Sequence, residues 1–251
     1  MTSESSTRNS PDHSRIASIQ KQVDRVIDDL RASLPKPDRL SAEERRGIIA
    51  RYTAVLEGNF IYWMTGAWLA VRSDAARAKI VENLQEEVRD AHPLMMRKFA
   101  MAAGALPTTA DTVAVHQSLT DMRLFIGRLS SVRIIVTMAF FEGLIQQFMP
   151  YLAELARLQG SSEMEYTDVH GVCDIGHTEE LYRALDAEMK LADEPIAAGN
   201  TFFEGVDLLR TLIEHIVTGP AAMARADKQY DARARHVPAP GIGASAVPAQ
   251  A

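Results

Sequence analysis

The sequence predicts an all-α bundle of seven helices, and three observations favour this fold class. Apolar residues recur every three or four positions along most of the chain, which is the period of an amphipathic helix. No segment of any length alternates apolar and polar residues as a strand does. Clusters of Pro, Gly and Ser, together with helix-capping patterns, separate the periodic segments.

The first two predicted helices have well-marked beginnings or ends. A helix over 15–33 carries a single apolar stripe and stops at a proline-rich turn. Ser41 and Glu44 match the capping box that opens a helix, and we expect this helix to cover 41–72. After Tyr52 it is apolar on nearly all sides, which indicates a central, buried position.

The third predicted helix is interrupted near Pro93. Ser73 is placed to cap a helix over 75–91, and Pro93 either ends this helix or breaks its continuation. A further helical segment reaches Ala103 and is closed by Gly104. We therefore expect a local distortion of the backbone close to Pro93.

The second half of the chain supplies the remaining helices. They are predicted over 109–129, 131–158, 163–192 and 200–224. Two serines separate the first pair by either a break or a kink, and a Gly-containing turn precedes the third. The chain is thus divided into a disordered segment over 1–14, a helical domain over 15–226 and a disordered Ala/Pro-rich tail over 227–251.

Composition excludes several classes of protein. The formal net charge of −6 and a pI near 5.7 give no basic footprint for nucleic acid. No apolar run reaches the roughly 18 residues of a membrane span, and the polar N-terminus lacks the apolar core of a secretory signal. Cys173 is the only cysteine, so an intramolecular disulfide is impossible. We expect a soluble cytoplasmic protein that binds neither nucleic acid nor membrane.

Three metal-capable side chains share one face of the helix predicted over 163–192. His170, Asp174 and His177 stand at i, i+4 and i+7, which places them within about 60° of one another around the helix axis. Two imidazoles and a carboxylate on one face form a candidate metal site. The alternative interpretation is a solvated polar face or a pH-sensitive start of the helix.

Two further candidates lie around the interruption near Pro93. Glu87 shares a helical face with Ile80 and Leu84, so its carboxylate points where apolar residues point. Glu86 lies about 100° away and is expected in solvent. His92 follows five residues after Glu87, and the expected distortion would bring both onto one site. The alternatives are an ordinary surface glutamate and a histidine that is satisfied at a helix end.

Glu142 lies at the edge of the apolar stripe of the helix over 131–158, between Phe141 and Ile145. A carboxylate among such neighbours is costly to bury unless it is paired or binds a metal, the alternative being a charge at the edge of the helix. The six candidates together offer carboxylate oxygens and imidazole nitrogens, which suit iron or manganese. They are Glu87, His92, Glu142, His170, Asp174 and His177.

These residues carry a resemblance to the haem-oxygenase-like diiron oxidases and oxygenases. The order Glu87, His92, Glu142 and then His170-x₃-Asp174-x₂-His177 is similar to the pattern of that family, over about residues 41–225. Because the spacing from Glu to His varies in the family, Glu86 stays open as an alternative ligand. Some members add a glutamate from the first long helix, for which Glu57 is the candidate.

The resemblance implies a seven-helix haem-oxygenase-like bundle that holds two Fe(2+) per chain without haem and uses O₂ as co-substrate. Such an enzyme would oxidise a small amine or an amino-acid-derived substrate by N-oxygenation, oxidative fragmentation or desaturation, in specialised metabolite biosynthesis. A homodimer is compatible with such a bundle. We expect the three ligands on one helix to hold one iron, and Glu87, His92 and Glu142 to hold the other.

Arg133 is a candidate for binding a substrate carboxylate. It falls close to the inward face of the helix over 109–129 if that helix continues without a break, and it is a surface arginine otherwise.

Two other functions compete with the diiron oxygenase. A ferritin-like iron-binding protein would use paired Glu-x-x-His motifs on two helices, which the chain does not have in that arrangement. A metal-free thiaminase-like or quinone-biogenesis relative of the same fold lacks the ligand set. A hydrolase of that branch would need a nucleophilic cysteine, for which only Cys173 is present.

Overall fold

The computed structural model describes residues 11–191 and 201–219, apart from the side chains of residues 11–14 and 172–175. Eight α-helices and one short 3-10 helix lie within these residues, and no strand occurs among them. The predicted all-α class is therefore confirmed. The predicted tail over 227–251 and most of the segment over 1–14 lie outside the described residues, so the domain limits stay a prediction.

The helices follow the predicted segments closely. Their bounds are α1 Pro11–Ser33, η1 Pro37–Arg39, α2 Ala42–Ala70, α3 Asp74–Arg89, α4 His92–Ala102, α5 Thr109–Gly127, α6 Ser131–Leu158, α7 Glu165–Met189 and α8 Glu204–Thr218. The described part has one α-helix more than the predicted seven, because the interrupted segment before Gly104 forms two separate helices. Ala91 adopts a left-handed conformation with φ of 55°, which ends α3 and starts α4 in a new direction.

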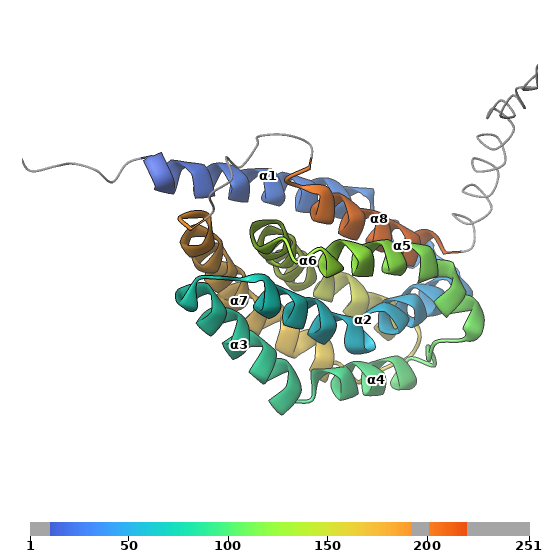
Figure 1. Ribbon diagram of the computed structural model, residues 1–251. Coiled ribbons are helices and arrows are strands. Elements are labelled where there is room, and N and C mark those ends of the chain that lie inside the picture. The colour runs from blue at the N-terminus through green and yellow to red at the C-terminus, as the bar shows by residue number, and fades with distance from the viewer. Residues whose placement is uncertain (1–10, 192–200, 220–251) are drawn as a thin grey trace, which may run out of the picture. The chain divides into compact units, whose positions relative to one another are not determined.

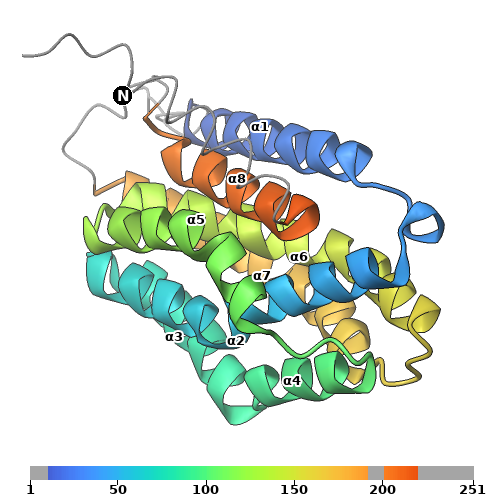
Figure 2. The same cartoon turned by 90° about the vertical axis from the view of Figure 1, so that its right-hand side faces the viewer.

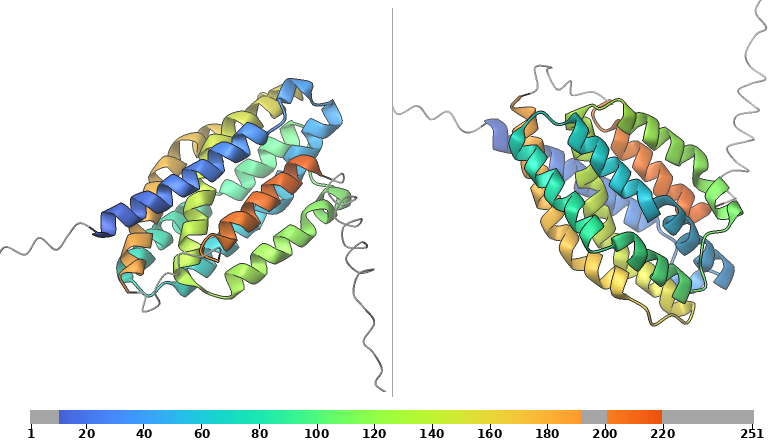
Figure 3. Two further views of the ribbon diagram at one scale, coloured as in Figure 1. Left: turned by 90° about the horizontal axis from the view of Figure 1, so that it is seen from above. Right: turned by 60° about the horizontal axis from the view of Figure 1, so that its bottom comes forward.

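Helix α6 runs through the middle of the described bundle. It packs along α7 and also contacts α1, α2 and α8. Helices α1 and α8 lie on one side of it, and α3 and α4 on the other (Figures 1 and 2). Figure 3 shows these two sides in turn. Helices α3, α4 and α7 also contact one another in pairs, so side chains from all three can meet.

Helix α2 begins as the capping box predicts and is interrupted once. The Ser41 hydroxyl accepts from the Glu44 N–H, and the Glu44 carboxylate accepts from the Ser41 N–H. The backbone leaves the helical conformation at Gly58, with φ of 175° and ψ of −11°. Most of the helix is buried, including the fully enclosed Trp63, whereas Trp68 near its end is exposed. Tyr62 is exposed as well, so the helix is buried on most of its sides and not all round.

The chain breaks between α5 and α6 instead of kinking. Leu129 adopts φ of 52°, and α6 begins anew at Ser131. Arg133 consequently belongs to the first turn of α6, where its guanidinium lies 3.8 Å from a carboxylate oxygen of Glu204. The continuous helix on which its inward direction depended does not form.

Helix α6 is the one helix of the described residues that is long and apolar enough to cross a membrane. However, 78% of the relevant stretch is buried inside the bundle. Burial of this kind is what a core helix of a soluble protein shows, and it accounts for the apolar composition without a membrane.

Glu188 of α7 binds the backbone that leads into α3. Its carboxylate is 2% exposed and accepts from the backbone N–H groups of Arg72 and Ser73, at 3.0 and 2.9 Å. Glu188→Ala should lower the free energy of unfolding by about 2–4 kcal/mol, because buried donors lose a charged acceptor. Urea unfolding would measure this. Glu179→Ala, which removes an exposed carboxylate from the same helix, should change stability by less than about 0.5 kcal/mol. Equal effects would contradict the assigned role.

Candidate metal centre

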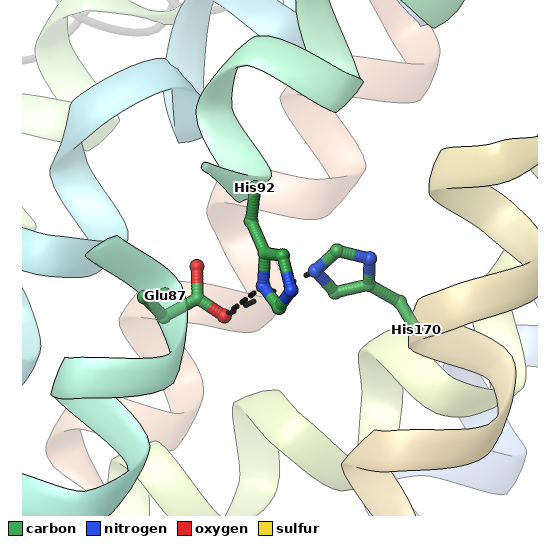
Figure 4. Close-up of side chains that lie close together, drawn as sticks. All are labelled: Glu87, His92 and His170. Carbon is green, nitrogen blue, oxygen red and sulfur yellow. Dashed lines mark hydrogen bonds and ion pairs between the residues drawn. The ribbon is translucent and has the colours of Figure 1, made fainter. Parts of the chain in front are cut away.

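Three helices bring Glu87, His92 and His170 together. Glu87 lies in the last turn of α3, His92 opens α4 directly after the left-handed Ala91, and His170 projects from α7 (Figure 4). The expected distortion before Pro93 is therefore present, and it turns His92 back toward Glu87. All three side chains are buried, with exposed fractions of 5–6%.

We call Glu87, His92 and His170 the triad. The distances between their side chains suit a metal ion bound by all three. The Nδ1 of His92 lies 2.7 Å from Oε1 of Glu87, and Nε2 of His170 lies 4.0 Å from the same oxygen. The centroids of the two imidazole rings are 4.4 Å apart. One ligand atom from each residue lies within 4.8 Å of the others. Two imidazoles and one carboxylate thus face a common point.

His170 is oriented by the turn of α7 that precedes it. The backbone carbonyl of Tyr166 lies 2.8 Å from Nδ1 of His170, and because a carbonyl only accepts, Nδ1 carries the proton. Burial lowers the pKa of His170 to about 4, so the ring is neutral at pH 7. Its Nε2, on the side of Glu87, therefore carries a lone pair that a metal requires.

His92 is held differently. Burial lowers its pKa, but the hydrogen bond to Glu87 and the nearby negative charges raise it by more, so that the net shift is upward. The hydrogen bond to Glu87 thus favours the protonated form of His92. A cation bound to the triad would displace the His92 proton, since only neutral imidazole ligates metal.

A second group of side chains adjoins the triad. Nε2 of His177 lies 2.8 Å from Oε2 of Glu86, and its Nδ1 lies 3.8 Å from Oε1 of Glu142. Asn83 donates to the same Glu142 oxygen at 2.8 Å. His177 and Glu142 are buried, whereas the Glu86 side chain is 33% exposed. We call His177, Glu86 and Glu142 the outer group.

Glu142 connects the two groups electrostatically. Burial raises its pKa to about 7, against the opposing effects of His177 and the Asn83 hydrogen bond. The negative charge of Glu87 contributes a further upward shift, and His92 a downward one. Glu142, a member of the outer group, therefore also interacts electrostatically with Glu87 and His92 of the triad. The raised pKa means that burial disfavours the charged form of Glu142, and a bound cation would offset this cost.

An apolar pocket lies against the triad. The space that water can occupy in it is about 30 Å³, and part of the pocket is open to solvent. Glu87, His92, Glu142 and His170 form its polar wall. The other lining residues, which are apolar or aromatic, are Leu56, Phe60, Ile61, Pro93, Met96, Phe141, Ile145 and Tyr166. A small organic molecule in this pocket would contact the triad directly.

The structure distributes the predicted site residues as follows. Glu87, His92 and His170 form the triad, and Glu142 and His177 lie beside it; the side chain of Asp174 is outside the described residues. Helical spacing groups His170 with His177, but the structure places them in different groups. His170 lies beside Glu87 of α3 and His92 of α4, whereas His177 lies beside Glu86 of α3.

The structure does not bring Glu57 or Arg133 to the pocket. Glu57 lies 2.6 Å from a guanidinium nitrogen of Arg97, and Arg133 faces Glu204. Neither side chain lines the space beside the triad.

Two residues that the sequence analysis left out, and one that it kept open as an alternative ligand, belong to this centre. Asn83 stands four residues before Glu87 and is 2% exposed, and its Oδ1 has no hydrogen-bond partner in the described part of the chain. Tyr166 stands four residues before His170 and lines the pocket. The i−4 spacing from a candidate ligand is the signal that identifies both. Glu86, expected in solvent, reaches His177 from α7, a contact between helices that periodicity does not reveal.

The chain matches the model of a known protein family. A family model described as iron-containing redox enzyme matches residues 50–206, a range that contains every residue of the triad and of the outer group. No curated protein matches the chain.

Proposed function

Because the chain belongs to this haem-oxygenase-like family of iron-containing redox enzymes, we propose that it is a non-haem diiron oxidase or oxygenase. In this proposal it uses O₂ to oxidise a small amine or an amino-acid-derived substrate. The observation that carries the proposal is the triad, since two histidines and one carboxylate around open space are the typical ligands of non-haem Fe(II) oxygenases.

The donor atoms of the centre fit iron. They are imidazole nitrogens and carboxylate oxygens, and no thiolate contributes to the triad or the outer group. His170 is neutral and already fixed in the tautomer that leaves Nε2 free for a metal. Burial of several carboxylates at one place is costly, and a divalent cation offsets this cost.

Two irons per chain fit the division of the centre into two groups. The triad would hold one iron, and His177 with Glu86 would hold the other, together with Asp174 of the same helix. Glu142 interacts electrostatically with both groups and would contact either iron or both. A reduced diiron centre supplies electrons to O₂ when it is bound here.

The surrounding residues orient the candidate ligands and exclude water from them. The Tyr166 carbonyl fixes the His170 ring, and Asn83 fixes one oxygen of Glu142. The apolar wall formed by residues such as Phe141 and Met96 excludes water from the space beside the triad.

The pocket also separates this proposal from its alternatives. An iron-storage protein needs no enclosed apolar space beside its ligands, whereas an enzyme that acts on an organic substrate does. A metal-free relative of the same fold lacks this set of candidate ligands. We also propose a cytoplasmic protein with a small-molecule substrate and no nucleic-acid or membrane partner, as its composition indicates.

Anaerobic iron loading tests the proposed function. The metal-free full chain should take up about two ferrous ions, as measured by elemental analysis after desalting. Exposure to O₂ should then consume O₂, and a panel of amines, amino acids and fatty acids should contain a compound that accelerates this consumption. Full activity with one iron per chain, or with none, would contradict the diiron assignment and favour the metal-free branch of the fold.

A further inference from the structure

The pocket beside the triad has a mouth that can be located from its lining. Of the twelve lining residues, Ile61 of α2 and Pro93 of α4 are half-buried, and the other ten are buried. Because only these two reach the surface, the pocket opens between α2 and the start of α4. A substrate that enters by this route passes between these two helices.

An ion pair joins the same two helices near this mouth. Arg97 lies one turn after Pro93 on α4, and its Nη1 is 2.6 Å from Oε1 of Glu57 on α2. The side chain of Arg97 is 57% exposed and that of Glu57 is 34% exposed. Both charges are therefore available to a molecule at the mouth, and each can exchange its present partner for a ligand group.

Inside the pocket, the carboxylates and imidazoles of the lining all belong to the two ligand groups. Apart from the residues of the two ligand groups, its lining is apolar except for the Tyr166 hydroxyl, which lies 2.9 Å from the hydroxyl of Tyr52. When the side chains of the two ligand groups hold iron, a substrate ammonium or carboxylate would lose its hydration there without a partner, which is costly. Charged groups of the substrate must therefore stay at the mouth while an apolar part enters.

Glu57 also faces a more open, polar hollow on the outer side of α2. Asn59, Tyr62 and Arg123 line this hollow together with Glu57, and Arg123 donates two hydrogen bonds to the Asn59 side chain. There is consequently room for a charged head group beside Glu57.

We propose that Glu57 and Arg97 bind the ammonium and the carboxylate of an amino acid whose apolar side chain enters the pocket. This inference rests on the proposed function, because it presumes that the pocket holds the substrate. One acidic and one basic side chain, side by side, complement the two charges of an amino acid. Glu57 would then act as a substrate-binding residue at the mouth and not as the additional metal ligand considered above.

Three probes of one carbon skeleton test this assignment. L-norleucine carries both charges, hexanoate lacks the ammonium, and pentylamine lacks the carboxylate. Calorimetry with the iron-loaded full chain, under anaerobic conditions, should show norleucine binding more tightly than either of the others. Arg97→Gln should weaken norleucine and hexanoate by about five- to tenfold, and Glu57→Gln should weaken norleucine and pentylamine similarly.

Arg128 provides a matched control. It pairs with Glu204 at 2.7 Å, with side chains 56% and 30% exposed, so its pair resembles that of Arg97 in length and exposure. Arg128→Gln should leave the affinity for norleucine within about twofold. Equal binding of the three probes, no binding of any, or an Arg97→Gln variant that behaves as Arg128→Gln does would overturn the assignment. Iron content measured on the same preparations tests the proposed function separately, since Glu57 and Arg97 lie outside both ligand groups.

Discussion

His170→Ala and His177→Ala should each leave about one iron per chain, and the double variant should bind none. The reason is that the two histidines, although seven residues apart on α7, face different partners. His170 lies 4.0 Å from Glu87 in the triad, and His177 lies 2.8 Å from Glu86 in the outer group. Loss of one ligand from a site of three or four donors typically weakens metal binding by at least 10- to 100-fold. O₂ consumption should fall to background in each single variant, because the proposed chemistry needs both irons.

The double variant separates this arrangement from the one that helical spacing predicts. If His170, Asp174 and His177 held a single iron between them, removing both histidines would still leave the iron of the other ligands. Retention of one iron by the double variant would therefore refute the division into triad and outer group. His116→Ala, which removes an exposed histidine of α5, should bind two irons as the unmodified chain does. Elemental analysis after anaerobic loading and desalting measures all four proteins.

The fold class could be predicted from the sequence because helical period and helix ends are local properties. The capping box of Ser41 and the caps at Ser73 follow from hydrogen bonds within four residues, and both are present. The number of helices was harder to predict, since it depended on one residue. Ala91 takes up a left-handed conformation that has no signature in an alanine, and this residue separates α3 from α4.

The candidate ligands could be predicted because each lies on an apolar face of its own helix. Their grouping could not, since it depends on which helices pack together. Glu86 was expected in solvent from its position on α3, yet it reaches His177 because α7 lies alongside. Arg133 was interpreted on the premise of a continuous helix, and the turn at Leu129 removes that premise. Side-chain direction along one helix is a local property, whereas the neighbours of that side chain are set by tertiary packing.

Glu142→Gln should stabilise the metal-free protein while it abolishes binding of at least one iron. Burial raises the pKa of Glu142 to about 7, so the folded chain resists ionisation of this carboxyl, which ionises near pH 4.5 when exposed. A carboxyl whose pKa is raised by folding destabilises the folded state increasingly as pH rises between these two values. Glutamine carries no charge and keeps an oxygen that can accept from Asn83. We expect a gain of about 2 kcal/mol in the free energy of unfolding at pH 7.5.

The pH dependence of this gain distinguishes a charge effect from a packing effect. The difference in stability between Glu142→Gln and the unmodified chain should be near zero at pH 4 and should grow until about pH 7. The difference must be used because His170, whose pKa burial lowers to about 4, changes the stability of both proteins in the opposite direction over a similar range. Urea unfolding in the presence of a chelator measures it, with the exposed Glu154→Gln as the control that should show no such trend. A gain that is constant with pH, or a loss of stability at pH 7.5, would mean that the buried charge of Glu142 does not destabilise the metal-free protein. A bound cation would then not be needed to offset that charge.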